Sequence, residues 1–244
     1  MIFLEGRHVS KNFGGLRALH QVDFTVEQGE TVGLIGANGA GKTTLFNLIG
    51  GVYGPSSGCI RFKGEDITGM KPYQICRRGI GRTFQVVKPF LNMTVLRNVS
   101  VGKLFGRDRL QYTKDAEDEA RGILEFVGLS GKAHIPTREL TLADRKRIEI
   151  ARSLATDPEL LLLDEVLAGL TPTETTEAMA LIQSIQQDLG VTILMVEHVM
   201  KAVVGVCSRI FVLHYGQKIA EGSPREIAEN PAVIKAYLGE KFEI

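Results

Sequence analysis

The sequence lacks a long apolar run, a cysteine framework and an excess of charge of one sign. No apolar stretch reaches the roughly 18 residues needed to cross a bilayer, which excludes an integral membrane protein. The N-terminus, MIFLEGRHVS, has too short an apolar stretch and too early an acidic residue for a secretory signal. Three widely spaced cysteines argue against disulfides or a zinc knuckle and favour a reducing cytosol.

Charge and complexity exclude further classes. Lys and Arg number 29 and Asp and Glu 28, and this net charge of +1 argues against a basic nucleic-acid binder or an acidic tail. No internal repeat or low-complexity segment is present, so a disordered chain is also excluded. A length of 244 residues fits one α/β domain, or a core domain with a smaller insert. Docking on a membrane partner remains compatible with all of this.

Short apolar runs alternate with helical patterns along the chain. Strands are predicted at 22–26, 31–35, 58–62, 160–163, 191–196 and 210–213, and helices at 42–49, 114–127, 140–155 and 174–189. The strand–helix–strand order after residue 158 predicts a parallel sheet with right-handed crossovers. A helical block at about residues 86–157 interrupts this α/β core.

A glycine-rich segment between a buried strand and a helix matches the phosphate-loop pattern G-x-x-x-x-G-K-[ST]. It consists of Gly36, Ala37, Asn38, Gly39, Ala40, Gly41, Lys42 and Thr43. Glycines let several backbone N–H groups converge on phosphates, and the helix that follows adds its positive N-terminal end. Lys42 supplies a charge for the β- and γ-phosphates, and Thr43 offers a hydroxyl to Mg²⁺. The alternative is a glycine-rich turn with an incidental Lys-Thr pair.

Two acids follow the apolar run at 160–163. Ligands of open parallel sheets bind at the carboxyl ends of strands, where Asp164 and Glu165 are expected. Asp164 can hold Mg²⁺, directly or through water, and Glu165 can polarise the water that attacks the γ-phosphate. The alternative, an exposed acidic turn, is less compatible with the phosphate loop upstream.

With these motifs the sequence resembles the ATP-binding subunits of ABC transporters, and most closely those of branched-chain amino acid importers. The resemblance covers nearly the whole chain and is carried by residues 9–19, 36–43, 82–85, 93–95, 162–165, 168–170, 196–198 and 221–239. It implies a P-loop NTPase fold with a parallel core sheet, antiparallel N-terminal strands and a helical subdomain. Residues 1–244 would then form a single ABC ATPase domain, with a RecA-like core at 1–85 and 158–244 and the helical subdomain at 86–157.

The resemblance assigns further residues to the nucleotide site. Phe13 matches the aromatic that stacks on adenine, and Ala18 the small residue lining the same pocket. Gln85 matches the glutamine that meets Mg²⁺ and the attacking water, and His198 the histidine that reaches the γ-phosphate. Thr44 extends the phosphate loop. The alternatives are a core phenylalanine, a solvated glutamine and a structural histidine.

The family's signature, Leu-Ser-Gly-Gly-Gln before a basic helix, is altered here. The corresponding run is Leu140, Thr141, Leu142, Ala143 and Asp144. In the family this signature contacts ATP bound to the opposite subunit. Both glycines are missing, although Thr141 keeps the hydroxyl and can cap the helix. Asp144 places a negative charge near a triphosphate, which is repulsive unless its side chain turns to the N–H groups of the first helical turn.

The segment after the acidic pair Asp164 and Glu165 also differs from the family's pattern, because Thr171 stands where the family usually has Asp. The chain's own phosphate-binding half therefore matches the family, whereas the half that it offers to a second subunit is weakened. This pattern favours a heterodimer with a second ABC ATPase that carries a full signature, over a homodimer.

The function implied is an ATPase that uses ATP and Mg²⁺ to power import, by dimer closure against membrane permease subunits. The chain would lie peripherally on the cytoplasmic face of the inner (plasma) membrane, with residues 86–91 as a contact patch for the permease. Nucleic acid is not expected as a partner, because acidic residues balance the basic helix after Asp144. Transporters of urea, amides or lipopolysaccharide, a soluble ABC ATPase acting on DNA or ribosomes, and a weakened regulatory subunit remain alternatives.

Overall fold

The computed structural model describes residues 1–85, 88–198 and 200–238. The chain forms two compact units, Met1–Pro72 with Thr192–Ile244, and Tyr73–Val191. Each unit is described by itself below. The predicted division into a core at 1–85 and 158–244 and a helical subdomain at 86–157 stays a prediction.

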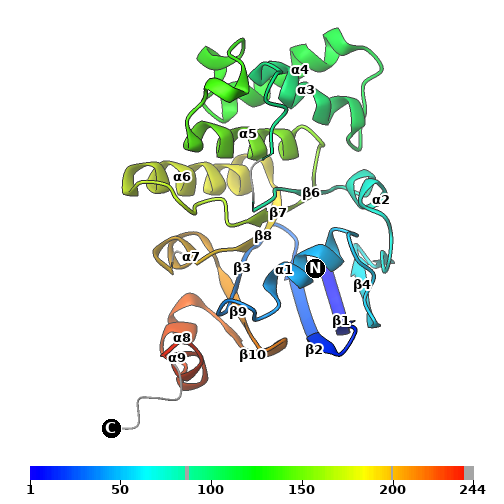
Figure 1. Ribbon diagram of the computed structural model, residues 1–244, viewed down its shortest axis with the longest axis vertical. Coiled ribbons are helices and arrows are strands. Elements are labelled where there is room, and N and C mark those ends of the chain that lie inside the picture. The colour runs from blue at the N-terminus through cyan, green and yellow to red at the C-terminus, as the bar shows by residue number, and fades with distance from the viewer. Residues whose placement is uncertain (86–87, 199, 239–244) are drawn as a thin grey trace. The chain divides into compact units, whose positions relative to one another are not determined.

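The first unit contains an antiparallel sheet made of N-terminal strands, as the sequence predicts (Figure 1). Its order is β2-β1-β4-β5, with β1 (Ile2–Phe13), β2 (Leu16–Glu27), β4 (Ser57–Phe62) and β5 (Glu65–Asp66). A two-residue turn joins β1 to β2, and Gly14 has a φ of +56° there, which glycine adopts without strain. The strand predicted at 22–26 is the buried-alternating part of the longer β2.

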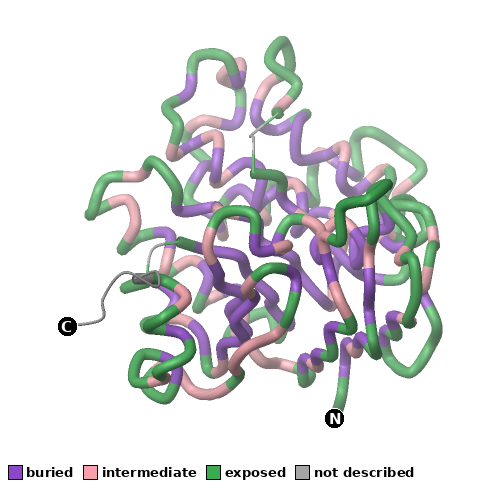
Figure 2. Tube along the Cα trace, turned by 60° about the horizontal axis from the view of Figure 1, so that its bottom comes forward, coloured by how far each residue is buried: buried purple, intermediate pink, exposed green. Residues whose placement is uncertain are grey.

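The same unit contains a second set of strands, which is mostly parallel. It comprises β3 (Thr31–Ile35), β8 (Thr192–Val196), β9 (Arg209–His214) and β10 (Gln217–Gly222). β3 pairs in parallel with both β8 and β9, and β10 pairs antiparallel with β9. β3 and β8 are buried along their whole length, which fits their apolar sequences. Figure 2 shows the buried parts of the chain in purple. The predicted parallel pairing is confirmed, and it places the residues after β3 and β8 at one edge.

In the described residues of the first unit, four helices accompany these strands. They are α1 (Lys42–Ile49), α7 (Met200–Val206), α8 (Pro224–Ala228) and α9 (Pro231–Leu238). α1 has the bounds that the sequence predicts, because apolar residues recur on one face directly after the glycine-rich loop. α8 begins at a capping box in which Ser223 and Glu226 bond reciprocally to each other's backbone N–H groups.

The second unit is mainly helical. It contains α2 (Pro72–Arg77), β6 (Ile80–Arg82), α3 (Val95–Phe105), α4 (Thr113–Phe126), the 3-10 helices η1 (Ser130–Lys132) and η2 (Thr137–Glu139), α5 (Leu142–Leu154), β7 (Leu160–Asp164) and α6 (Pro172–Leu189). β6 and β7 pair in parallel, so their carboxyl ends lie side by side. The predicted amphipathic helix at 114–127 corresponds to α4. Its buried face consists of Ala116, Ala120 and Leu124, and the helix packs on α3.

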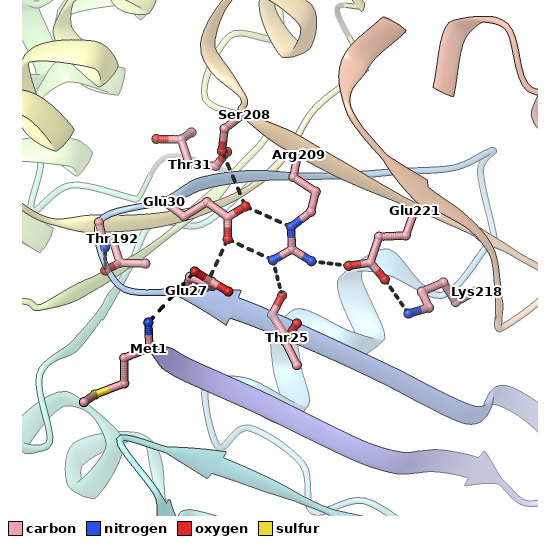
Figure 3. Close-up of polar contacts among 11 residues, drawn as sticks. Met1, Thr25, Glu27, Glu30, Thr31, Thr192, Ser208, Arg209, Lys218 and Glu221 are labelled. Carbon is pink, nitrogen blue, oxygen red and sulfur yellow. Dashed lines mark hydrogen bonds and ion pairs between the residues drawn. The ribbon is translucent and has the colours of Figure 1, made fainter. Parts of the chain in front are cut away.

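A partly buried ion-pair cluster ties together four segments of the first unit (Figure 3). The Arg209 guanidinium on β9 donates from Nε and Nη2 to both Glu30 oxygens, at 2.8 Å each, and from Nη2 to Thr25 O on β2 at 2.9 Å. It also bonds Glu221 on β10. Burial raises the pKa of the Glu30 carboxyl, but the bonds from Arg209 outweigh it and leave the pKa below its usual value.

Replacing Arg209 with methionine should therefore destabilise the chain, by about 1–3 kcal/mol at pH 7, since it leaves Glu30 without its bidentate partner. Because the pKa of Glu30 is depressed in the folded state, its contribution is full above the unfolded value of about 4.3 and is lost as pH falls through the folded pKa. In urea unfolding experiments, the difference in unfolding free energy between wild type and the variant should become smaller below about pH 4. Arg225→Met, in an exposed pair with Glu229, is the control, and an equal loss there would contradict the assignment.

Candidate functional site

The phosphate loop follows β3 in the first unit, and its backbone has room for glycine alone at two positions. A Cβ at Gly36 would lie 2.2 Å from Leu213 O, and one at Gly41 would lie 2.7 Å from Ala18 O. Both glycines also have positive φ, at +155° and +103°. The loop therefore runs tightly between β9 and β2, which leaves its N–H groups rather than side chains to face an anion.

Lys42 and Thr43 stand at the start of α1, with different surroundings. The Lys42 side chain is buried, and its Nζ donates to Gly36 O at 2.7 Å and Ala37 O at 3.1 Å. Thr43 is exposed at the same helix terminus. The lysine charge is thus held against the loop, and the positive end of the helix adds to it. This geometry suits a polyanion.

Ala18 lies beside the loop, which fits its predicted place in the pocket wall. The turn between β9 and β10 links the phosphate loop to β2, the strand that carries Ala18. Gly216 N in this turn donates to Ala40 O at 3.0 Å, and His20 N on β2 donates to Gly216 O at 2.8 Å. Phe13 ends β1, where the hairpin returns toward Ala18 on β2. Its ring is 39% exposed, so part of it is open for stacking.

His198 follows β8 in the same unit and is exposed. β8 is the parallel neighbour of β3, so His198 and the phosphate loop lie at the carboxyl ends of adjacent strands. This is the edge at which a parallel sheet binds its ligands. The predicted residues Phe13, Ala18, 36–44 and His198 are accordingly all carried by the first unit.

The second unit brings Gln85 and Glu165 together. Gln85 follows β6 and Glu165 follows β7, and the Gln85 Nε2 donates to Glu165 Oε2 at 2.8 Å. The Gln85 amide and the Glu165 carboxylate each carry an oxygen acceptor besides the atoms that form this bond. The pair can therefore present two oxygen acceptors to a water molecule, which is what activation of a nucleophilic water needs.

Asp164 is the last residue of β7 and is 2% exposed. Arg82 Nη2 donates to its Oδ2 at 3.1 Å, and its backbone N–H donates to the Thr83 hydroxyl at 3.0 Å. Burial lowers the pKa of Arg82, although an arginine stays charged at neutral pH. The ion pair orients the carboxylate, and this role of Arg82 could not be predicted from its place in the segment 82–85.

Glu165 has an unusual backbone conformation. Its φ is +52°, in the left-handed region that residues other than glycine seldom adopt. Lys146 on α5 is buried and donates from Nζ to the Glu165 carbonyl at 2.8 Å, which holds that conformation. Strain of this kind is found at functional sites, where surrounding contacts enforce it. Lys146 belongs to the basic helix that follows Asp144, yet its side chain is buried rather than solvated.

The altered signature begins α5. The predicted cap is confirmed, since the Thr141 hydroxyl accepts from Asp144 N at 3.2 Å. The Asp144 carboxylate turns back to Thr141 Oγ1 at 3.0 Å and pairs with Lys132 Nζ at 2.6 Å, rather than with the helix N–H groups. Burial raises the pKa of Asp144, but Lys132 and Thr141 outweigh it and keep it low. The negative charge that the sequence introduces is thus compensated within the subunit.

The other departures also have local structural roles. Leu142 is 49% exposed, and its side chain lies against Gly169, where an added Cβ would be 3.3 Å from Leu142 Cδ2. Ala143 beside it is half-buried. Thr171 caps α6 in a capping box with Glu174. Leu142 and Ala143 therefore put side chains on a surface where the family has bare backbone.

Comparison with known proteins gives concordant results. The ABC transporter family model matches residues 19–168, and the model for branched-chain amino acid ATP-binding cassette transporters matches residues 217–243. The chain is 40% identical to the high-affinity branched-chain amino acid transport ATP-binding protein BraF of Pseudomonas aeruginosa, over 97% of this chain and 98% of that protein. It is 42% identical to LivG of Escherichia coli K12, a protein of the same description, over 93% and 94%.

Solved structures agree. A nucleotide-free ATP-binding cassette from an ABC transporter superposes with a TM-score of 0.91 at 31% identity, covering 98% of this chain and all of the other. The ADP conformation of MJ1267, an ATP-binding cassette of an ABC transporter, superposes with a TM-score of 0.90 at 31% identity. It also covers 98% of this chain and all of the other. The predicted P-loop ATPase fold is confirmed, and the chain belongs to the ABC transporter family as one of its ATP-binding subunits.

Proposed function

We propose that this chain hydrolyses ATP to power an importer of branched-chain amino acids, as one ATPase of a dimer bound to membrane permease subunits. The observation that carries the substrate class is likeness along nearly the whole chain, at 40% and 42% identity, to two ATP-binding proteins of branched-chain amino acid transport. The family match at 217–243 supports it independently, because it lies outside the general ATPase match.

ATP binds at the phosphate loop in this proposal. The backbone N–H groups of 36–44, the charge of Lys42 and the positive end of α1 hold the phosphates. Phe13 and Ala18 receive the adenine. Gln85 and Glu165 orient the attacking water, and Glu165 polarises it, while His198 reaches the γ-phosphate.

The residues proposed for Mg²⁺ are Thr43, Gln85 and Asp164. They offer a hydroxyl, an amide oxygen and a carboxylate, which are hard oxygen donors of the kind that Mg²⁺ prefers. Within the described part of the chain no three acidic, histidine or cysteine side chains cluster to form a cage, which fits a metal carried largely by phosphates and water. When bound, Mg²⁺ neutralises charge that develops on the β- and γ-phosphate oxygens.

The dimer is proposed to be a heterodimer. Leu142 and Ala143 leave side chains where a second subunit's ATP would approach backbone, so this chain completes its partner's site poorly. Asp144 does not add repulsion of its own, since Lys132 pairs with it. A weakened regulatory subunit is the alternative, and it is distinguished by whether the site built on Lys42 hydrolyses ATP.

The permease contact is proposed at the segment after Gln85. Of residues 86–91, Val86 and Val87 lie outside the described part of the chain. Phe90 and Leu91 are exposed apolar side chains, at 45% and 49%. Buried Asn98 on α3 clamps the Phe90 backbone, accepting from its N–H at 2.8 Å and donating to its carbonyl at 3.0 Å. A firmly held apolar patch suits docking of a partner helix.

The proposed location is the cytoplasmic face of the plasma membrane, through the permease. In the described ranges 1–85, 88–198 and 200–238, no helix has both the length and the apolar character to cross a bilayer. Attachment would therefore rest on protein contacts of these residues.

Reconstitution tests the proposal. The tagged chain is purified with the membrane and ATPase subunits that accompany it, and the complex is inserted into vesicles with a matching binding protein. ATP-dependent uptake of labelled leucine, isoleucine and valine should exceed that of urea and small amides by at least about tenfold, because a hydrophobic pocket discriminates weakly among similar aliphatics but strongly against small polar solutes. Preferred uptake of urea or amides, or export of lipopolysaccharide, would replace the substrate class. Co-purification with DNA or ribosomes alone would overturn the transport assignment.

A further inference from the structure

A cluster of two aromatic rings and a lysine surrounds Phe13. The Phe13 and Tyr53 rings meet edge to face, with centroids 5.3 Å apart and planes at 80°. The Lys11 ammonium lies over both rings, 5.1 Å from the Phe13 centroid and 5.6 Å from that of Tyr53. Such contacts fix the orientation of a ring that is otherwise exposed at a strand end.

The cluster is fastened to the loop that joins α1 to β4. Lys11 Nζ donates to Gly54 O at 2.7 Å, and Asn12 N donates to Ser56 Oγ at 3.0 Å. Ser56 N donates to Ser10 O at 2.7 Å. These bonds hold loop 50–56 against the end of β1, so Tyr53 keeps a fixed place beside Phe13.

The same loop is continuous with the phosphate-binding helix. α1 begins at Lys42 and ends at Ile49, and Tyr53 N bonds to Asn47 O on its last turn at 3.3 Å. A rigid helix of this kind links the position of the aromatic pair to the loop that holds the phosphates. Lys11 lies within the stretch 9–19 that carries the family resemblance, whereas Tyr53 lies outside every stretch recognised in the sequence.

We propose that Tyr53, supported by Lys11, is a positioning residue that fixes the Phe13 ring for stacking on the adenine of ATP. Lys11 lies over the Phe13 ring and Tyr53 packs against it at a near right angle, and the two contacts together fix how the ring is turned. Both Phe13 and Tyr53 stay partly exposed, at 39% and 41%. The inference rests on the proposed function, because it assumes that Phe13 receives adenine.

The test compares Mg-ATP with magnesium tripolyphosphate, which has the phosphates but no base, by calorimetric titration of the full chain. Tyr53→Ala should weaken ATP binding about three- to tenfold and leave tripolyphosphate binding unchanged. Tyr53→Phe keeps the ring and should restore ATP binding. In the assembled complex the alanine variant should raise KM for ATP without lowering kcat, which a general loss of structure would not do.

Val52→Ala, in the same loop and similarly exposed, is the matched control and should bind both ligands as wild type does. Equal weakening of ATP and tripolyphosphate by Tyr53→Ala would overturn the inference, since the residue would then act on the phosphate loop. Unchanged ATP binding would overturn it too. Failure of the proposed function is separable: wild-type chain would bind no Mg-ATP, or Phe13→Ala would leave the ratio of the two affinities unaltered.

Discussion

Replacing Lys42 with alanine is expected to lower ATP hydrolysis at this chain's own site by at least about 100-fold and to abolish ATP-driven uptake in the assembled complex. The Lys42 ammonium is buried against the Gly36 and Ala37 carbonyls of the phosphate loop. Its removal takes away the only side-chain charge of the loop at the place where negative charge grows during phosphoryl transfer.

The measurement is steady-state phosphate release, with uptake of labelled leucine by the same vesicles. Lys235→Ala on α9 is the control, because it removes an exposed lysine of the same unit and should leave both rates unchanged. The thermal midpoint of the Lys42 variant separates loss of charge from loss of folding, since two loop hydrogen bonds disappear with the side chain. Continued uptake by a folded Lys42→Ala complex would contradict the transport-motor assignment.

Much of the site could be read from the sequence because its chemistry depends on short segments at strand ends. The phosphate loop needs glycines at fixed positions, and the two tightest, Gly36 and Gly41, are both in the motif. Asp164 at the end of β7 and Glu165 after it could be placed in the same way, since an all-apolar run of strand length is buried on both faces. Residue types and spacing are sufficient there.

The contacts that support these residues could not be predicted. Arg82, Lys132 and Lys146 act on residues 82, 12 and 19 positions away in sequence. A long basic residue looks the same in the sequence whether its side chain faces solvent or bonds to an oxygen of another element. Only the packing of α5 and of the strand pair β6 and β7 distinguishes the two cases.

Several elements were not predicted as such, and α3 and β1 are two whose absence from the prediction has a clear physical reason. α3 carries buried Asn98, Ser100 and Lys103, so its inner face does not show the apolar period of a helix. The burial of β1 does not alternate strictly, because register shifts against β2 interrupt the regular turning of its side chains. Periodicity finds elements whose buried face is apolar, and these two depart from that rule.

Replacing Glu165 with glutamine should reduce hydrolysis about 100- to 1,000-fold while leaving ATP binding intact. The amide keeps the size of the carboxylate and an oxygen that can still accept from Gln85 Nε2. The backbone, held at positive φ by Lys146, is unaffected. The change therefore isolates the charge that polarises water. With Mg-ATP the variant should accumulate as a closed dimer, visible as a larger mass in light scattering.

Glu125→Gln on α4, which alters an exposed carboxylate of the same unit, is the matched control and should turn over ATP normally. A Glu165→Gln variant that keeps more than about a tenth of wild-type hydrolysis would exclude the carboxylate as the base. Loss of ATP binding together with hydrolysis would instead give Glu165 a structural role.

The Glu165→Gln variant also tests how much each of the two sites of the proposed heterodimer contributes to ATP hydrolysis. The site on this chain's Lys42 is completed by the partner's signature, whereas the partner's site is completed by Leu142 and Ala143. Glu165→Gln should therefore remove nearly all hydrolysis, and the equivalent change in the partner should remove little. A homodimer of this chain should turn over slowly, because both of its sites receive the altered signature. Ordinary turnover at both sites of a homodimer would show that the side chains at 142 and 143 leave room for the γ-phosphate after all.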